Sequence, residues 1–209
     1  MLIAKEQYDS HFDALINSGV ACDNLTPLAP VCPICLHPFS NERATSVATK
    51  EDAPPQSLGG TKVALTCKKC NNSAGQDIDI HLVNLLKHLD QRSFHKGSTR
   101  RVRIYDGSEI VNGLLTVGDN KELTLEVLKK INDSRKLPNI LSQWKPEKDL
   151  SFSNQKLKLS EKNLNAAILK TAYILLYSKL GYSVLLWDEY NQIREQIQNP
   201  DLTIVPPLW

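Results

Sequence analysis

Four cysteines in two closely spaced pairs are the residues of this sequence best suited to chemistry. Cys32 and Cys35 form one Cys-x2-Cys pair, and Cys67 and Cys70 form the other. Zn²⁺ accepts four thiolates tetrahedrally, and a two-residue gap lets both sulfur atoms of a pair reach one ion. The spacing therefore predicts a structural zinc site. Two disulfides are the alternative, and they would require an oxidising compartment.

Length, charge and hydropathy narrow the class of protein. The chain has 209 residues, of which 41% are hydrophobic, so it can bury a substantial core in one larger domain or two small ones. Its formal charge of only +2 means that any nucleic-acid contact must come from local patches. The first residues are too polar for a signal peptide, and no unbroken apolar stretch reaches the roughly 20 residues of a membrane span. We therefore expect a cytoplasmic protein without a membrane segment, whose thiols stay reduced and available to a metal.

The residues around the cysteines predict a strand, a loop, a second strand and a helix. Residues 44–50 and 63–66 are rich in β-branched side chains, and prolines and glycines separate them. Apolar residues at helical spacing predict an amphipathic helix over 77–92. An N-terminal helix is expected over 4–18. Its apolar face comprises Tyr8, Phe12, Leu15 and Ile16.

The second half of the chain predicts a small antiparallel sheet followed by helices. Alternating apolar residues mark strands over 102–105, 110–117 and 123–127, with Asp106-Gly107 as a two-residue hairpin turn. The polar stretch 144–158 is interpreted as a linker.

Two helices are expected after this linker. Ser160 is the expected N-cap of a helix that ends at Gly181, and Pro200 ends a short helix over 190–197. One side of the longer helix carries Leu164, Ala167, Ile168, Thr171, Ala172 and Leu175.

These elements predict an α+β protein. We expect an N-terminal helix and lead-in over 1–30, a zinc-binding module over 31–95 and a mixed C-terminal domain over 96–209.

Residues 32 to 82 resemble the HNH endonuclease family, in the branch that binds zinc through two Cys-x2-Cys pairs. The resemblance is carried by Cys32-Pro-Ile-Cys35, Lys50-Glu-Asp-Ala-Pro-Pro55, Leu58-Gly-Gly60, Leu65-Thr-Cys-Lys-Lys-Cys-Asn-Asn72 and Gly75. It implies a ββα-metal module that hydrolyses DNA phosphodiester bonds with one Mg²⁺ or Mn²⁺. Glu51 and Asn71 match the positions that hold this cation, and their oxygen atoms suit such hard ions.

The sequence departs from the family at Asp52. The family normally has a histidine after the metal-binding acid, because an imidazole can accept a proton from water at neutral pH. Asp52 either acts as the base or a second ligand in a working variant, or marks a site that has lost hydrolysis and kept binding. His81, ten positions after Asn71, is the nearest substitute base, and a histidine on the helix surface is its structural alternative.

DNA is the expected partner of this module. Basic side chains inside and after the second cysteine pair could neutralise backbone phosphates, although runs of charge often form solvated faces. The residues concerned are Lys68, Lys69, Lys96, Arg100, Arg101 and Arg103. The predicted function is a DNA endonuclease, a hydrolase of phage defence or restriction. The alternative is a catalytically inactive HNH-like zinc module that binds nucleic acid or a protein partner, and the apolar C-terminal helix could also pack on a second copy in a homodimer.

Overall fold

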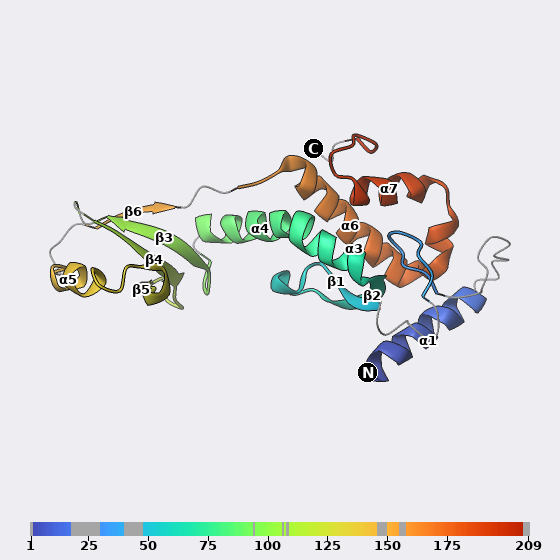
Figure 1. The fold of residues 1–209 in the computed structure, drawn as a ribbon, viewed down its shortest axis with the longest axis horizontal. Coiled ribbons are helices and arrows are strands. Elements are labelled where there is room, and N and C mark those ends of the chain that lie inside the picture. The colour runs from blue at the N-terminus through green and yellow to red at the C-terminus, as the bar shows by residue number, and fades with distance from the viewer. Residues whose placement is uncertain are drawn as a thin grey trace. The chain divides into compact units, whose positions relative to one another are not determined.

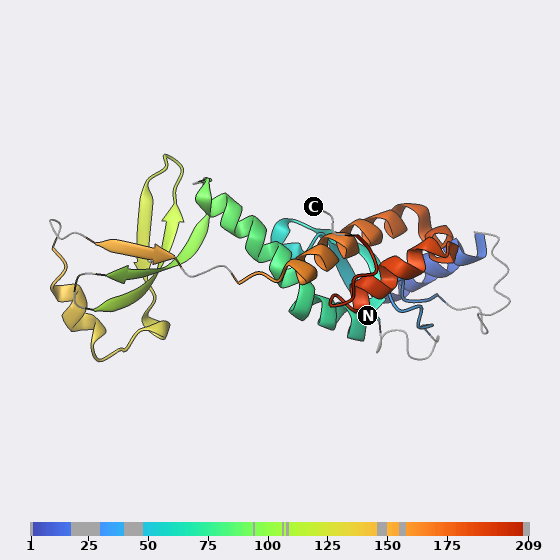
Figure 2. The ribbon, with the colours of Figure 1, turned by 90° about the horizontal axis from the view of Figure 1, so that it is seen from above.

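The computed structural model combines helices with two small antiparallel sheets (Figures 1 and 2), which confirms the predicted α+β class. The residues that it describes are 2–17, 30–39, 48–93, 95–105, 107, 109–145, 150–154 and 158–206. No helix in this described part combines the length and apolarity that crossing a membrane requires.

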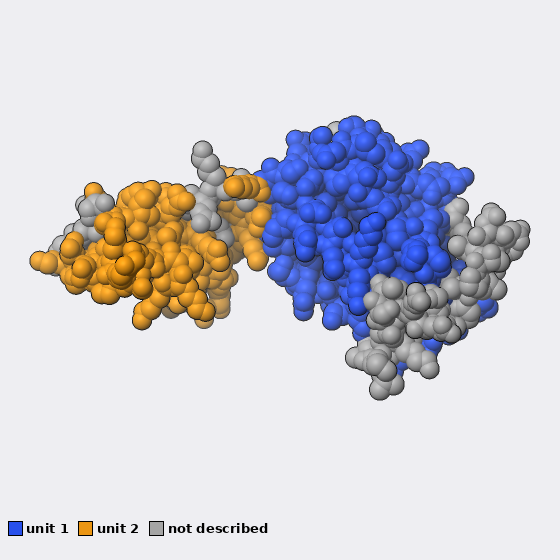
Figure 3. Space-filling view, viewed as in Figure 1, with its two compact units in different colours: residues 1–83, 159–209 blue, residues 84–158 orange. Residues whose placement is uncertain are grey.

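The chain divides into two compact units, coloured separately in Figure 3. Unit 1 comprises residues 1–83 and 159–209, and unit 2 comprises residues 84–158. This division differs from the predicted domains over 31–95 and 96–209. The reason is that the C-terminal helices pack against the cysteine-bearing segment, so that unit 2 interrupts unit 1 in the sequence.

A two-stranded hairpin lies at the centre of unit 1. β1 (Ala48–Ala53) pairs antiparallel with β2 (Thr61–Cys67), and the short 3-10 helix η1 (Gln56–Leu58) lies in their connection. Both strands were predicted, but β1 runs through Glu51 and Asp52 instead of ending before them. Residues 44–47 of the predicted strand lie outside the described residues. A register shift falls between Glu51 and Asp52, and such bulges redirect the side chains that follow.

Helical structure begins directly after β2, nine residues earlier than the predicted start at residue 77. α3 (Lys68–Ser73) continues into η2 (Ala74–Asp79), which is π-helical, and then into α4 (Ile80–Arg92). The wider π turn buries Ala74, Ile78 and Asp79 on its inner side. π turns within helices are frequent at functional sites.

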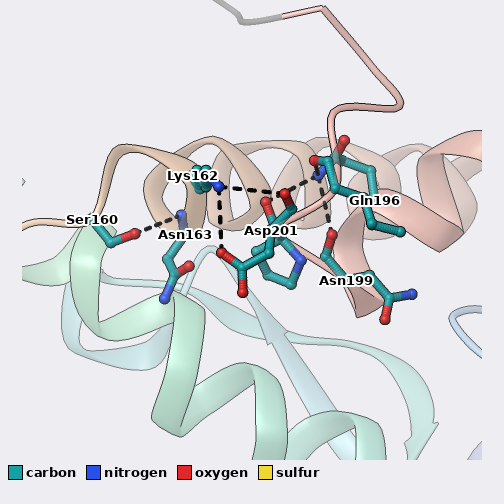
Figure 4. Close-up of polar contacts among 8 residues, drawn as sticks. Ser160, Lys162, Asn163, Gln196, Asn199 and Asp201 are labelled. Carbon is teal, nitrogen blue, oxygen red and sulfur yellow. Dashed lines mark hydrogen bonds and ion pairs between the residues drawn. The ribbon is translucent and has the colours of Figure 1, made fainter.

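α6 (Glu161–Leu180) is the helix against which the hairpin packs, with contacts to β1, β2 and η2. It begins at Ser160 as predicted, because the Ser160 Oγ accepts a hydrogen bond of 3.3 Å from the Asn163 N–H (Figure 4). It ends at Gly181 as predicted. The face assigned to the core was wrong in part, since Ala172 and Leu175 are exposed. The buried residues are Leu164, Ala166, Ala167, Lys170, Tyr173, Ile174 and Tyr177.

Two shorter elements complete the C-terminal part of unit 1. η4 (Gly181–Leu186) leads to α7 (Glu189–Gln198), which ends before Pro200 as predicted. Lys162 of α6 pairs with the Asp201 carboxylate at 3.6 Å, and the Gln196 amide donates to the Asn199 carbonyl at 3.4 Å (Figure 4). The first contact links the chain after α7 to the start of α6, and the second ties that chain to the end of α7.

The N-terminal helix α1 (Leu2–Asn17) was predicted within two residues at each end. It contacts η4 and the hairpin. Leu15 is buried as expected, whereas Ile16 is 51% exposed and was wrongly assigned to the packed face. The side chains of Tyr8 and Phe12 lie outside the described residues.

Unit 2 contains the predicted small sheet, with one strand more than expected. Its strand order is β5-β4-β3-β6, and all pairs are antiparallel. The strands are β3 (Thr99–Tyr105), β4 (Ile110–Val117), β5 (Leu123–Val127) and β6 (Ser151–Asn154). β6 arises from the stretch interpreted as a linker. Tyr105 pairs with Ile110, so residues 106–109 connect β3 to β4 in place of the predicted two-residue turn, and Asp106 lies outside the described residues.

One face of this sheet is packed. Val102 and Ile104 of β3 and Val111 and Leu115 of β4 form a buried cluster with Leu137 of the short helix α5 (Leu137–Ser142). The 3-10 helix η3 (Lys129–Ile131) lies between β5 and α5. The alternation of β3 leaves Arg101, Arg103 and Tyr105 on the opposite face.

The hairpin connection yields a stability prediction at Gly60. A Cβ atom added there would lie 1.5 Å from the Pro54 carbonyl oxygen, which is backbone and cannot rotate away. We expect Gly60→Ala to lower the free energy of unfolding by at least about 1–3 kcal/mol, the usual cost of overpacking. Gly75→Ala is the matched control, because a Cβ at Gly75 meets nothing within 4 Å. Chemical denaturation of both variants tests this, and equal stabilities would contradict it.

Candidate functional site

The four predicted ligand cysteines come together in one cluster. The sulfur atoms of Cys32, Cys35, Cys67 and Cys70 all lie within 4.8 Å of one another, and none of the four is in a disulfide. The Cys35 and Cys67 sulfurs are 3.7 Å apart. A tetrahedral zinc site with Zn–S bonds near 2.3 Å places its sulfurs roughly 3.8 Å apart. The donor set and its spacing thus suit a metal such as Zn²⁺.

Backbone hydrogen bonds shape the loop that carries the first pair. The Cys32 N–H donates to the His37 carbonyl at 2.9 Å, and the Leu36 N–H donates to the Cys32 carbonyl at 2.8 Å. Leu36 adopts a φ of 57°, a left-handed conformation that tightens the turn. Residues 31 and 38 pair across it. The turn thereby directs both sulfurs of the pair to the same side.

Side chains of the C-terminal helices hold this loop in place. The Tyr173 hydroxyl donates to the Pro33 carbonyl at 2.8 Å, and the Gln198 amide donates to the Ile34 carbonyl at 3.1 Å. The Tyr182 hydroxyl accepts from the Val31 N–H at 3.1 Å. Three residues distant in the sequence therefore satisfy backbone groups of the metal-binding loop.

The second pair is placed by the junction of β2 and α3. Cys67 is the N-cap of α3, and its sulfur accepts a hydrogen bond of 3.3 Å from the Cys70 N–H. The Cys32 sulfur likewise accepts from the Cys67 N–H at 3.3 Å. Hydrogen bonding with Cys32 lowers the pKa of Cys35 and of Cys67, whereas hydrogen bonding with Cys35 raises the pKa of Cys32 and contributes to the raised pKa of Cys70. Part of the cluster thus favours thiolates, the form that binds metal, and a bound cation would favour ionisation of the rest.

Glu51, the predicted acidic ligand of a catalytic cation, lies in a buried charged cluster. Its side chain is 3% exposed, and its Oε1 atom lies 2.6 Å from the Nζ of Lys170. The Glu51 Oε2 atom accepts a hydrogen bond of 3.2 Å from the Thr66 hydroxyl. Lys170 Nζ also lies 2.5 Å from Asp79 Oδ2. Strand β1, the π turn η2 and the middle of α6 thus meet in one interaction.

This cluster contains two carboxyl groups but only one ammonium group. Burial raises the pKa of Glu51 and of Asp79, and the Lys170 ammonium opposes the rise at both. Two carboxylates share one ammonium, which is why the ion pairs do not overcome the cost of burial. The second oxygen of Asp79, Oδ1, is buried and has no hydrogen-bond partner within the part of the chain that the structure describes.

Asn71 and Asp52 lie close in the sequence to members of this cluster, Asp52 directly after Glu51 and Asn71 five residues after Thr66. Asn71 is half-buried at the junction of β2 and α3, and its Nδ2 donates to the Lys50 carbonyl at 3.1 Å. This contact places the amide against the residue that precedes Glu51. Asp52 is half-buried in β1, immediately after the register shift. Their predicted roles as cation ligand and base stay predictions.

His81 of α4 lies against the start of α6, where it contacts two residues. Its Nδ1 accepts a hydrogen bond of 3.1 Å from the Ser160 N–H, and its Nε2 lies 3.4 Å from the Asn163 amide nitrogen. These contacts give His81 a structural position between α4 and α6, and its role as a base stays a prediction.

The predicted phosphate-binding residues fall into two groups. Lys68 and Lys69 are exposed at the start of α3 in unit 1. Arg101 and Arg103 are exposed on the open face of the sheet in unit 2. Also in unit 2, Lys96 pairs with Asp119 at 3.1 Å in an exposed contact, and Arg100 is half-buried on the packed side of β3.

Asp79, Lys170 and Thr66 were not identified from the sequence as site residues. Thr66 carried no signal beyond its position in a predicted strand. Lys170 did carry one, because it is the single charged residue within the stretch Leu164–Tyr177 of an apolar helix, and buried lysines need a partner.

No family model, curated protein or solved structure matches this chain.

The tetrad yields a prediction on metal content. We expect the purified protein to carry one zinc ion per chain and Cys67→Ser to lose it, because a site with three thiolates cannot satisfy the tetrahedral ion equally well. Structural zinc sites contribute on the order of 10 kcal/mol of apparent binding free energy at neutral pH, so the variant should also unfold at a markedly lower temperature. Cys22→Ser, at the fifth cysteine, is the control. Elemental analysis and thermal denaturation test this, and full zinc content in Cys67→Ser would disprove the tetrad.

Proposed function

We propose that this chain is a metal-dependent HNH-type endonuclease that hydrolyses phosphodiester bonds in DNA. The observation that carries the proposal is the position of Glu51. The family resemblance assigns Glu51 to a catalytic cation. Glu51 lies in a buried cluster of ionisable groups, near the junction of β2 and α3 that carries Cys67 and Cys70. Buried ion pairs contribute little stability compared with apolar packing, whereas clustered ionisable groups with shifted pKa values are typical of functional sites.

In this proposal Glu51 and Asn71 would hold a Mg²⁺ or Mn²⁺ ion, which supplies positive charge to the scissile phosphate and the leaving oxygen. The chain itself positions the reacting groups. Asp52 accepts a proton from the attacking water as the water oxygen bonds to phosphorus and the bond from phosphorus to the leaving oxygen breaks. Its half-buried position in β1, next to Glu51, supports this role, because its carboxylate stays accessible to water.

DNA as the substrate is supported by an uneven distribution of charge. Residues 84–158 contain 15 lysines and arginines against 9 acidic residues, whereas the rest of the chain contains 10 against 14. Within this basic unit, Arg101 and Arg103 extend from an inner strand of the sheet, on the face opposite the packed core. We propose that this face binds backbone phosphates, which would hold the duplex without reading its sequence.

A second candidate function is a zinc module that binds nucleic acid without hydrolysing it. One observation favours it. Glu51 is almost fully buried and is already paired with Lys170, so a cation can bind there only if the ammonium moves. Cleavage assays separate the two candidates.

The cleavage prediction concerns supercoiled plasmid in the presence of Mg²⁺ or Mn²⁺. We expect the wild-type protein to nick it, and Asn71→Ala to lower the rate on the order of 10- to 100-fold, as loss of a group that supports a metal site does. Asp52→Asn should lower it about 100-fold or more if Asp52 is the base. Asn72→Ala is the matched control, since Asn72 is the adjacent, exposed asparagine. An inert wild-type protein that still binds DNA would favour the second candidate.

The binding prediction concerns the open face of the sheet. We expect the double variant Arg101→Ala, Arg103→Ala to bind DNA duplexes more weakly than the wild-type protein, by a similar factor for duplexes of unrelated sequence. The slope of log affinity against log salt should fall by about one for each phosphate that the variant no longer neutralises. Arg135→Ala is the control, because Arg135 is a highly exposed arginine of the same unit outside the sheet. Fluorescence anisotropy over a salt series measures both quantities, and an unchanged slope would contradict the assignment.

A further inference from the structure

Lys170 occupies a position at which an apolar helix normally carries an apolar residue. It lies on the buried side of α6 between Ala166 and Ala167, one turn earlier, and Tyr173 and Ile174, one turn later. Its side chain is 1% exposed, and its ammonium lies between two carboxylates, at 2.6 Å from Glu51 and 2.5 Å from Asp79. The lysine is therefore an internal cation of unit 1.

The two carboxylates offer more negative charge than this cation neutralises. Two carboxylates and one ammonium leave one negative charge in the interior when all three groups are ionised. Among the described residues, the buried Asp79 Oδ1 atom has no hydrogen-bond partner, so this oxygen has a free coordination position. Oxygen atoms of paired carboxylates are the ligands that hard divalent cations prefer. A doubly charged ion would neutralise both ionised carboxylates and would give the free oxygen a partner.

The backbone places Asp79 for this purpose. In the π turn η2, Ile78 and Asp79 are both buried, and Asp79 reaches the same point in space as Glu51 of β1. Two separate elements thus contribute one carboxylate each.

We propose that Glu51 and Asp79 form a binding site for a divalent cation such as Mg²⁺ or Mn²⁺, and that the Lys170 ammonium competes for this site. Asp79 is then a cation ligand in addition to the residues of the proposed nuclease, and Lys170 keeps the site closed until the ion displaces it. The inference shares Glu51 with the proposed function and deepens it, by naming a further ligand and the group that controls access.

Lys170→Met tests the competition, because methionine is similar in length and apolar but carries no charge. The probe is Mn²⁺, titrated into zinc-loaded protein and followed by the electron paramagnetic resonance signal of the free ion. Zinc should stay on the thiolates, since they bind Mn²⁺ more weakly. We expect Lys170→Met to bind one Mn²⁺ per chain at least tenfold more tightly than the wild-type protein. Mn²⁺ should also raise the melting temperature of Lys170→Met by more than it raises the melting temperature of the wild-type protein.

Two further variants make the result specific. Lys170→Met combined with Asp79→Asn should lose the tight Mn²⁺ binding and keep zinc, whereas Lys179→Met, at an exposed lysine of the same helix, should behave as wild type. A folded, zinc-loaded Lys170→Met protein that binds Mn²⁺ no more tightly than wild type would overturn the inference and leave a purely structural ion pair.

If Lys170→Met does not fold, its response to Mn²⁺ still tests the site. If Lys170→Met is unfolded without Mn²⁺, recovery of its folded circular dichroism signal on addition of Mn²⁺, but not of NaCl at equal ionic strength, supports the site. If Mn²⁺ has no effect and the folded signal returns only when Asp79→Asn is added to Lys170→Met, the proposed cation site is overturned. These measurements contain no DNA, so a failure of the proposed cleavage does not alter them, and their failure does not alter a cleavage assay on the wild-type protein.

Discussion

The convergence of four thiols is the constraint on which the rest of unit 1 depends. Their sulfur atoms lie within 4.8 Å of one another although the two pairs are separated by more than 30 residues of chain. Thiolates this close repel one another unless a cation lies between them, so a metal such as Zn²⁺ would stabilise the cluster in this arrangement. Because Cys67 is both the last residue of β2 and the N-cap of α3, the same cluster sets where the strand ends and where the helix begins.

The C-terminal helices cover the hairpin and satisfy backbone groups of the cysteine-bearing segment. A two-stranded hairpin is marginal by itself and needs another element to cover it. α6 provides this cover, and Tyr173, Tyr182 and Gln198 satisfy backbone groups of the first metal-binding loop. Lys170 adds a charged contact at the same interface. Unit 1 is therefore assembled from two distant parts of the chain, and the cysteine-bearing segment forms only one side of its core.

Local patterns predicted local structure well. The cysteine spacing indicated the tetrad, β-branched runs indicated both strands of the hairpin, and Ser160 and Gly181 marked the ends of α6. The predictions failed where tertiary packing decides. Leu175 and Ala172 fit an apolar stripe on α6, yet the helix turns Lys170 inward, because two carboxylates from other elements meet it there. Residues 151–154 are too polar to resemble a strand, and they become β6 because β3 has an unpaired edge that accepts backbone hydrogen bonds.

The long sequence separation of these contacts has a consequence for synthesis. The Lys170–Asp79 pair joins residues 91 positions apart, and the bond from Val31 to Tyr182 spans 151. On the ribosome the thiols emerge first and can take up metal early, whereas Glu51 and Asp79 stay in water until α6 has been translated. Contacts this remote close slowly compared with local ones. A nascent chain thus passes through a stage in which its acidic residues are hydrated and open to ions, and the interior closes only when α6 has been made.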